Sequence, residues 1–267
     1  MVDTYIPPVD VLAIDDCCFD TTFGCEPDEP ALIACDVCAD GGIASGPALP
    51  GSSAQNACCV GGVWQFDGSA TLSITGGGAY DTIIVFGHTL DSITTPFGTK
   101  PGLCESECGD FYAPVVFHGP LSTGAVNLSL IGIGPQCVER IVVGRKMYFP
   151  EGLGLDFNDI FDGHDCKTDV KMSACGTPMS ATIMRDAVSL DLNIQCVDQA
   201  WIKQFWRPAV RYMCRYGVCF MPSVNHCPDD VFCGWFDSSG GGSSYQGPWS
   251  KTVSLQATGY TGVAPIK

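Results

Sequence analysis

Short apolar runs separated by turn residues dominate the sequence from about residue 62 onward. Ala70, Leu72 and Ile74 alternate with Thr and Ser, which is the period of a half-buried strand. Ile83 to Phe86 is a continuous apolar run, as expected for a strand that is buried on both faces. Further strands are predicted at residues 115–117, 126–133 and 138–143. The pattern predicts a β-sandwich or jelly roll over roughly residues 45–147.

The second half of the chain predicts more strands and one helix. Val188, Leu190, Leu192, Ile194 and Cys196 alternate strictly with other residues, which gives the clearest strand pattern in the sequence. Asp198 is suited to N-cap a short helix, and Pro208 to open a further helical turn. That helix would carry Trp201, Ile202 and Phe205 on one face. Strands are expected at residues 218–221, 231–236 and 253–257, with a flexible Gly/Ser loop at 238–244. The predicted fold class is all-β: a sandwich followed by a second β-rich module with one short helix.

The first 44 residues lack a regular pattern. Proline and glycine punctuate them, and no helical period survives. Three segments are therefore predicted: a cysteine-rich irregular segment at 1–44, a β-sandwich at 45–150 and a second β-rich module at 151–267.

Charge separates the two halves of the chain. Residues 1–139 hold 17 acidic residues and one basic residue, Lys100, so they carry the whole net charge of −16. Residues 140–267 hold 12 of each sign and are neutral. The acidic half is expected to repel nucleic acid and anionic membranes. No apolar run approaches the length of a membrane helix and no signal peptide is visible, so we expect synthesis in the cytoplasm, no export by the usual route and no membrane insertion.

The 17 cysteines are dense for a protein made in the cytoplasm, and their odd number leaves at least one outside intrachain disulfides. A protein that is made inside a cell but works outside it would reconcile cytoplasmic synthesis with this density of cysteine. Disulfides are favoured over a zinc or iron–sulfur site in both candidate clusters. The cluster members are Cys35 and Cys38 with Cys58, Cys59, Cys104 and Cys108 in the front half, and Cys214, Cys219, His226, Cys227 and Cys233 in the second. Calcium is not expected at the acidic run 156–165, because Ile160 stands where an oxygen ligand is needed.

No catalytic motif is present. The sequence contains no nucleophile elbow, no HExxH motif and no P-loop. His118, His164 and His226 lie in sequence contexts typical of loops. We therefore expect a protein that is not an enzyme and has no favoured cofactor.

Three arginines recur every fourth residue in the region of the predicted helix: Arg207, Arg211 and Arg215. On a helix they form one basic stripe. Because the surrounding module is neutral, the stripe is expected to meet the acidic half of the same chain or of a neighbour.

Residues 45–260 resemble tail proteins of long-tailed bacteriophages that contain a galactose-binding-like jelly roll. The resemblance rests on the segments 64–74 and 80–90 and on the closing pattern at 141–150. Downstream, the alternating strand at 188–196 precedes a W-x-x-x-x-W helix, Trp201 to Trp206, and an aromatic strand at 232–235.

The resemblance implies a structural, non-enzymatic virion protein in the tail tip or baseplate, or at the tail-fibre junction. Its partners would be copies of itself in a ring or trimer and other phage tail proteins. One alternative is a host-adhesion protein that binds a surface glycan, with Trp64, Asp67 and His88 as the implied site. Another is a tail-hub component that carries zinc or an iron–sulfur cluster.

Overall fold

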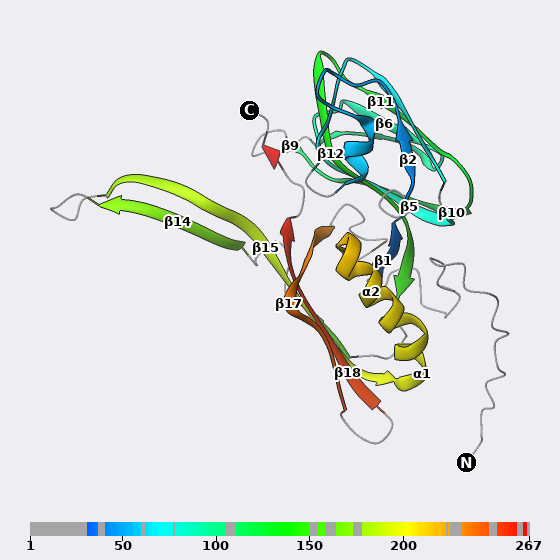
Figure 1. Cartoon of the computed structure of the whole chain (residues 1–267), viewed down its shortest axis with the longest axis vertical. Coiled ribbons are helices and arrows are strands. Elements are labelled where there is room, and N and C mark those ends of the chain that lie inside the picture. The colour runs from blue at the N-terminus through cyan, green and yellow to red at the C-terminus, as the bar shows by residue number, and fades with distance from the viewer. Residues whose placement is uncertain are drawn as a thin grey trace.

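The computed structural model describes residues 31–36, 41–59, 62–76, 78–104, 111–149, 154–157, 164–172, 178–222, 224, 231–245, 250–260 and 264–265. Most of this part of the chain forms antiparallel β-sheet, so the predicted all-β fold class is confirmed (Figure 1). No helix among these residues is long and apolar enough to cross a membrane.

The largest sheet among the described residues has 11 strands and runs through both halves of the molecule. Its main path is β10 (Val115–Ser122), β5 (Tyr80–His88), β12 (Pro135–Tyr148), β1 (Ala31–Asp36), β16 (Val218–Met221), β17 (Phe232–Tyr245), β18 (Ser250–Tyr260), β15 (Pro178–Asp198) and β13 (Gly154–Phe157). Off this path, β3 (Trp64–Asp67) pairs with β12, and β14 (His164–Met172) pairs with β15.

Two smaller sheets complete the β structure. A five-stranded sheet has the order β2 (Ile43–Ser45), β4 (Ala70–Thr75), β11 (Val126–Ile131), β6 (Ser92–Thr95) and β7 (Gly98–Pro101). A three-stranded sheet has the order β19 (Ala264–Pro265), β9 (Phe111–Tyr112) and β8 (Leu103–Cys104). A short 3₁₀ helix, η1 (Ala54–Cys58), precedes β3.

The sandwich core lies between the five-stranded sheet and the β3, β5, β10 and β12 part of the large sheet. Leu72 and Ile74 of β4 meet Ile83 and Val85 of β5 there, all essentially inaccessible to water. The alternation along β4 therefore has the predicted cause, because one face packs inward and the other faces solvent.

Strand β5 is buried on both faces, as its continuous apolar run predicts. Ile83 and Val85 enter the sandwich core, whereas Ile84 and Phe86 enter another core that includes Met221 of β16. The strand therefore lies between two apolar layers, which explains why its sequence does not alternate.

One helical segment covers the second half of the sheet. It comprises α1 (Gln199–Trp201), the π-helical turn η2 (Ile202–Trp206) and α2 (Arg207–Tyr216), and it lies beside β17 and β18 (Figure 1). Trp201, Ile202 and Phe205 are buried in a core that also holds Leu190 and Leu192, as predicted. Asp198 occupies the N-cap position, but its side chain makes no capping hydrogen bond.

The π turn lies directly before Pro208. Proline cannot donate the hydrogen bond that an α-helix requires at this position. The N–H of the preceding residue, Arg207, donates to the carbonyl of Ile202, five residues back, which is the π-helical spacing. The helix ends at Gly217, whose φ of 89° favours glycine, and Arg140 of β12 donates from Nη2 to the Tyr216 carbonyl at 2.9 Å. This buried arginine ties the sandwich half to the helix.

Two expectations about irregular segments are wrong. Within the predicted irregular segment 1–44, residues Ala31–Asp36 form β1, an interior strand that pairs with both β12 and β16. The run 238–244, predicted as a flexible loop, lies in β17, where Gly241 to Tyr245 pair with β18. Backbone pairing overrides the low strand propensity of glycine and serine there, with a register shift between Phe236 and Gly241.

The predicted boundary at residue 150 separates two cores but not two sheets. The sandwich core lies before it and the core around the helix lies mostly after it. The large sheet and the core that includes Ile84 and Met221 continue across it. The segment boundaries themselves stay predictions.

One disulfide, Cys219 to Cys233, joins facing residues of β16 and β17. It closes a loop with a sequence separation of 14 residues. The predicted stapling of a hairpin in the second cysteine cluster is therefore confirmed for this pair.

Replacing both Cys219 and Cys233 with alanine should lower the free energy of unfolding by about 2–4 kcal/mol, because the unfolded chain regains the entropy of the open loop. Urea denaturation under oxidising conditions measures this change. Cys214→Ala, at an exposed free thiol on α2, is the matched control and should have no effect. Equal stability of the double variant and the control would contradict the prediction.

Candidate functional site

A connected set of polar side chains lies where three neighbouring strands meet. Asp81 and Thr82 come from β5, His118 from β10 and Lys146 from β12. His118 stands directly opposite Thr82 in the strand register. Because alternate residues of a strand share a face, Thr82 and His118 lie on the same face as Ile84 and Val116, so they border that apolar core.

Asp81 is held by two donors. The hydroxyl of Thr82 donates to its Oδ1 at 2.8 Å, and the backbone N–H of Lys146 donates to the same oxygen at 3.0 Å. Burial raises the pKa of the Asp81 carboxyl, while Lys146 and the hydrogen bond from Thr82 lower it. Burial also lowers the pKa of Lys146, and Asp81 opposes that shift. The two groups therefore support each other's charge inside the protein.

Nδ1 of His118 lies near two polar groups. Nδ1 lies 3.4 Å from Nζ of Lys146, and an ammonium group can only donate. When Lys146 donates, Nδ1 accepts and a neutral ring carries its proton on Nε2. Oγ1 of Thr82 also lies 3.5 Å from Nδ1, and the direction of that contact depends on the tautomer. Nε2 is buried and has no hydrogen-bond partner among the described residues. Burial, followed by the charges of Lys146 and Lys100, lowers the pKa of His118 to about 4, which keeps the ring neutral near pH 7.

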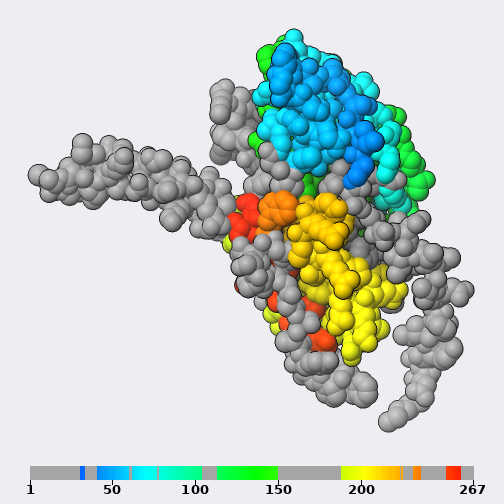
Figure 2. All heavy atoms as spheres, viewed as in Figure 1, coloured from blue at the N-terminus to red at the C-terminus, as the bar shows by residue number. Residues whose placement is uncertain are grey.

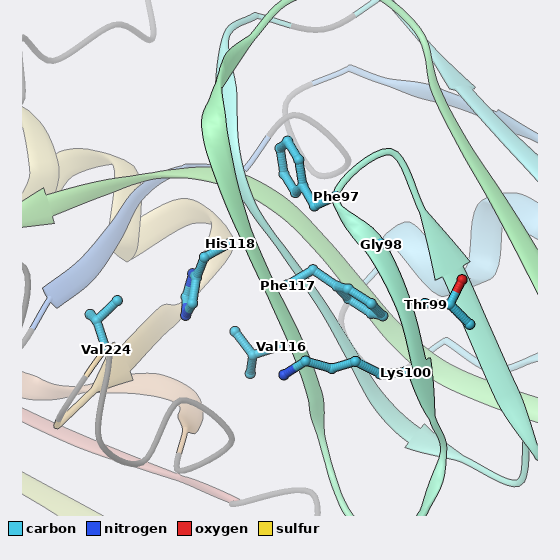
Figure 3. Close-up of a pocket in the computed structure, with 8 residues that line it drawn as sticks. All are labelled: Phe97, Gly98, Thr99, Lys100, Val116, Phe117, His118 and Val224. Atoms are coloured by element: carbon cyan, nitrogen blue, oxygen red, sulfur yellow. The ribbon is translucent and has the colours of Figure 1, made fainter.

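His118 also lines a pocket of about 330 Å³ (Figure 3). Strand β10 contributes Val116, Phe117 and His118 to its lining, and the segment at the start of β7 contributes Phe97, Gly98, Thr99 and Lys100, with Val224 alongside. Nζ of Lys100 lies 5.8 Å from the centre of the Phe117 ring, which is within cation–π range. The described lining therefore combines two aromatic rings, one ammonium group and one imidazole.

The glycan site implied by the resemblance is not supported at Trp64. The indole is fully buried, packs 4.4 Å from the Phe66 ring between centroids, and donates from Nε1 to the carbonyl of Pro47 at 2.8 Å. A ring with no exposed face cannot stack on a sugar, so that role is contradicted.

His88 is also a core residue. Its Nε2 lies 2.9 Å from the Ala113 carbonyl and Nδ1 accepts from the N–H of Leu90 at 3.3 Å, so both ring nitrogens have partners. Burial lowers the pKa of His88 to about 4. Asp67 alone of the three implied residues is exposed, at the end of β3. The structure does not bring them together as a surface site.

The three predicted interface arginines lie where the sequence places them. Arg207, Arg211 and Arg215 are exposed on α2, while Ala209 and Met213 face the core. Figure 2 shows the helix at the surface of the molecule. Their predicted acidic partners stay untested.

The metal hypothesis finds no assembled site among the described residues, where no three metal-ligating side chains converge. Cys219 and Cys233 are joined to each other instead, and Cys214 is an exposed free thiol. Cys38, His226 and Cys227 lie outside the described residues, and of Cys35 only the backbone is described.

Sequence reasoning missed the polar set around His118. It placed His118 in a loop context, whereas the residue lies within β10. The available signal was Lys146, a charge inside the apolar closing strand that must be compensated if that strand is buried. Which residues compensate it depends on strand order, which the sequence pattern does not contain.

Comparison of the chain with protein-family models, with curated proteins and with solved structures finds no match in any of the three.

The protein should lose stability as the pH falls from 6.5 toward 4. An unfolded imidazole binds its proton near pH 6.5, whereas His118 in the folded state does so near 4, so the unfolded state binds more protons in this window. When the pH falls from 7.5 to 5, the titration of His118 alone should lower the free energy of unfolding by about 2 kcal/mol. His88 acts in the same direction, and the raised pKa of Asp81 opposes both.

Urea denaturation at the two pH values, on the full chain and on His118→Gln, measures the contribution of His118. The variant should lose about 2 kcal/mol less than the full chain on acidification. An unchanged pH dependence in the variant would show that His118 does not titrate as inferred.

Proposed function

We propose that this chain is a non-enzymatic structural subunit that acts by assembling with copies of itself and with other proteins in the tail of a long-tailed bacteriophage. The observation that carries the proposal is a two-stranded ribbon that projects from the body of the molecule (Figure 1).

The strand register defines the ribbon. From Val188 onward β15 pairs with β18, and its residues 192–195 also pair with β13. Before Val188, from Pro178 to Ala187, its only partner among the described residues is β14. At about 3.3 Å per residue, these ten residues reach on the order of 30 Å beyond the three-stranded region.

A ribbon of this kind favours a partner. An isolated two-stranded hairpin is marginally stable in water, because it has no core of its own. Among the described residues, no further strand pairs with β14 or with residues 178–187 of β15, and unpaired strand edges are templates for another strand or surface. Packing against a neighbouring subunit would give the ribbon a surface on which to bury its side chains.

The distribution of charge supports the same proposal. Subunits that each carry −16 in their front half repel one another when they are crowded into a ring or trimer. The exposed arginines of α2 supply positive charge on the other half, where they would meet acidic residues of a neighbouring subunit.

The tail location rests on the resemblance of residues 45–260, and the all-β fold is consistent with it. Within the tail, the tip or baseplate and the tail-fibre junction both suit a subunit that bridges neighbours through an arm. The glycan-binding alternative loses Trp64 and His88 to the core. The metal-carrying alternative has no observation that favours it.

Shortening the ribbon should abolish self-assembly without unfolding the body. Thr168 and Ile183 face each other, so replacing residues 169–182 with Asn-Gly leaves a shorter hairpin closed by a two-residue turn. Light scattering coupled to size-exclusion chromatography should show an oligomer for the full chain and a monomer for the variant. Ile133→Ser, at an exposed residue of the sandwich, is the control and should assemble normally. A monomeric full chain, or a variant that assembles equally well, would refute the proposal.

Replacing Arg207, Arg211 and Arg215 together with glutamine should slow assembly but leave the subunit folded. Exposed charge pairs add little stability but do affect encounter rate and register. The expected result is slower growth of light scattering at low salt, with the same thermal unfolding midpoint as the parent chain. High salt should reduce the difference, because it screens the charges. Identical assembly rates at both salt concentrations would mean that the stripe is only a solvated face.

A further inference from the structure

The large sheet has two different faces in the second half of the molecule. One face packs on the helix through buried residues such as Leu190, Leu255 and Ala257. Because alternate residues of a strand point to opposite faces, the residues between these form the other face. They are exposed or half-buried. With Trp235 of β17 they form three cross-strand rows: Trp235, Thr258 and Ser189; Gln256 and Asp191; Ser254 and Asn193.

Trp235 is the aromatic residue of these rows. Its side chain is 41% exposed, whereas the other tryptophans that the structure describes are buried. Cys233, the preceding residue on the same face, is fully buried in the core that β5 shares with β16. The pairing of β16 with β17 ends at Gly234, so Trp235 is the first side chain beyond that cover. It leaves on the order of 100 Å² of its surface in contact with water.

Polar groups lie within reach of the indole ring. Thr258 stands directly opposite Trp235, and Gln256 is its diagonal neighbour at about 7–8 Å, which a long or aromatic side chain can span. Ser189 and Asp191 stand beside these two on the next strand. Gln256 donates from Nε2 to Oδ2 of Asp191 at 3.3 Å, which holds the amide beside the carboxylate. The face therefore presents an aromatic ring next to hydroxyl, amide and carboxylate groups.

The charge of this face favours a neutral ligand that is rich in hydroxyl groups. Asp191 is the one charged residue in the three rows, and none of their members is basic. A carboxylate repels anions but accepts hydrogen bonds from hydroxyl groups. The amide of Gln256 and the hydroxyls of Thr258 and Ser189 can each donate and accept. Such a set matches a ligand whose edges carry hydroxyls and whose flat face is apolar.

We propose that this face binds a neutral oligosaccharide. One sugar ring lays its C–H face on the indole of Trp235, while its hydroxyls exchange hydrogen bonds with Thr258, Gln256 and Asp191. The three rows extend for about 13 Å along β18, which is longer than one sugar ring, so a further sugar unit would contact the row of Ser254. The site lies beside the base of the ribbon but uses none of its residues, so it adds a ligand to the proposed assembly function.

An array of immobilised glycans provides the first test. The full chain is applied to neutral oligosaccharides and to sialylated, sulfated and phosphorylated ones. We expect retention on a subset of the neutral glycans and weaker retention on the anionic ones, because Asp191 repels negative charge. The neutral glycan that is retained best is then titrated in solution by isothermal calorimetry.

Four variants make the test specific. Trp235→Ala should weaken binding of that glycan about tenfold or more, because it removes the stacking surface. Trp235→Phe keeps a smaller ring and should retain part of the affinity. Asp191→Asn should also weaken binding, because an amide oxygen is a poorer acceptor than a carboxylate. Ile133→Ala, at a 90% exposed apolar residue of the sandwich, is the control and should bind like the parent chain.

Several results would overturn the proposal. They are no retention on any neutral glycan, a preference for anionic glycans, and an affinity that Trp235→Ala leaves unchanged or that Ile133→Ala weakens equally. Loss of oligomer in Trp235→Ala would also contradict it, because the ring would then contact a neighbouring subunit. The thermal unfolding midpoint of each variant without glycan distinguishes loss of the site from loss of the fold, and Asp191→Asn decides if Trp235→Ala unfolds. Absence of glycan binding leaves the proposed assembly function standing.

Discussion

Burial of β5 and β12 on both faces is the constraint on which the rest of the structure depends. Each strand sends alternate side chains into the sandwich core and into the core shared with the second half of the chain. Ile84 and Val142 are paired across the two strands and point away from the sandwich, so a sandwich alone would leave them in water. The second half supplies the missing cover through β16 and Val231. Burial of one such side chain is worth about 1.5–3 kcal/mol. Covering the outward-facing apolar side chains of β5 and β12 with the second half therefore stabilises both halves.

The polar set around His118 follows from the same arrangement. Thr82 lies on the same face of β5 as Ile84 and Phe86. The polar set around His118 therefore lies at one end of an apolar layer. A lysine is tolerated at this depth because Asp81 lies close enough to support its charge. The orphaned Nε2 of His118 is then a consequence of geometry. The ring is oriented by Lys146 on one side, and its other nitrogen is buried without a hydrogen-bond partner among the described residues.

Much of the fold could be predicted from the sequence, because two-residue alternation and turn residues report burial directly. The strands around Leu72, Ile84 and Leu190 and the helix with its buried Trp201 were predictable on this basis. Strand β1 was not, because its pairing partner β16 lies almost 190 residues further along the chain and leaves no local signature.

The site was the least predictable part. Trp64 has the aromatic character of a sugar platform, and only the packing of Phe66 and the Pro47 carbonyl shows that it is a core residue. Asp81, His118 and Lys146 are brought together by strand order alone.

The position of β1 has a consequence for synthesis on the ribosome. Residues 31–36 leave the exit tunnel early, and β12 can cover one of their edges once residue 148 has been made. The other edge stays open until residues 218–221 arrive, so the nascent chain carries an uncovered strand through about 70 further residues, or several seconds at ordinary elongation rates of about 5–20 residues per second. During that interval the chain is exposed to wrong pairing with neighbouring nascent chains on the same message. A protein built in this way would depend on chaperone binding or on the pace of translation for its yield, even where its finished fold is stable.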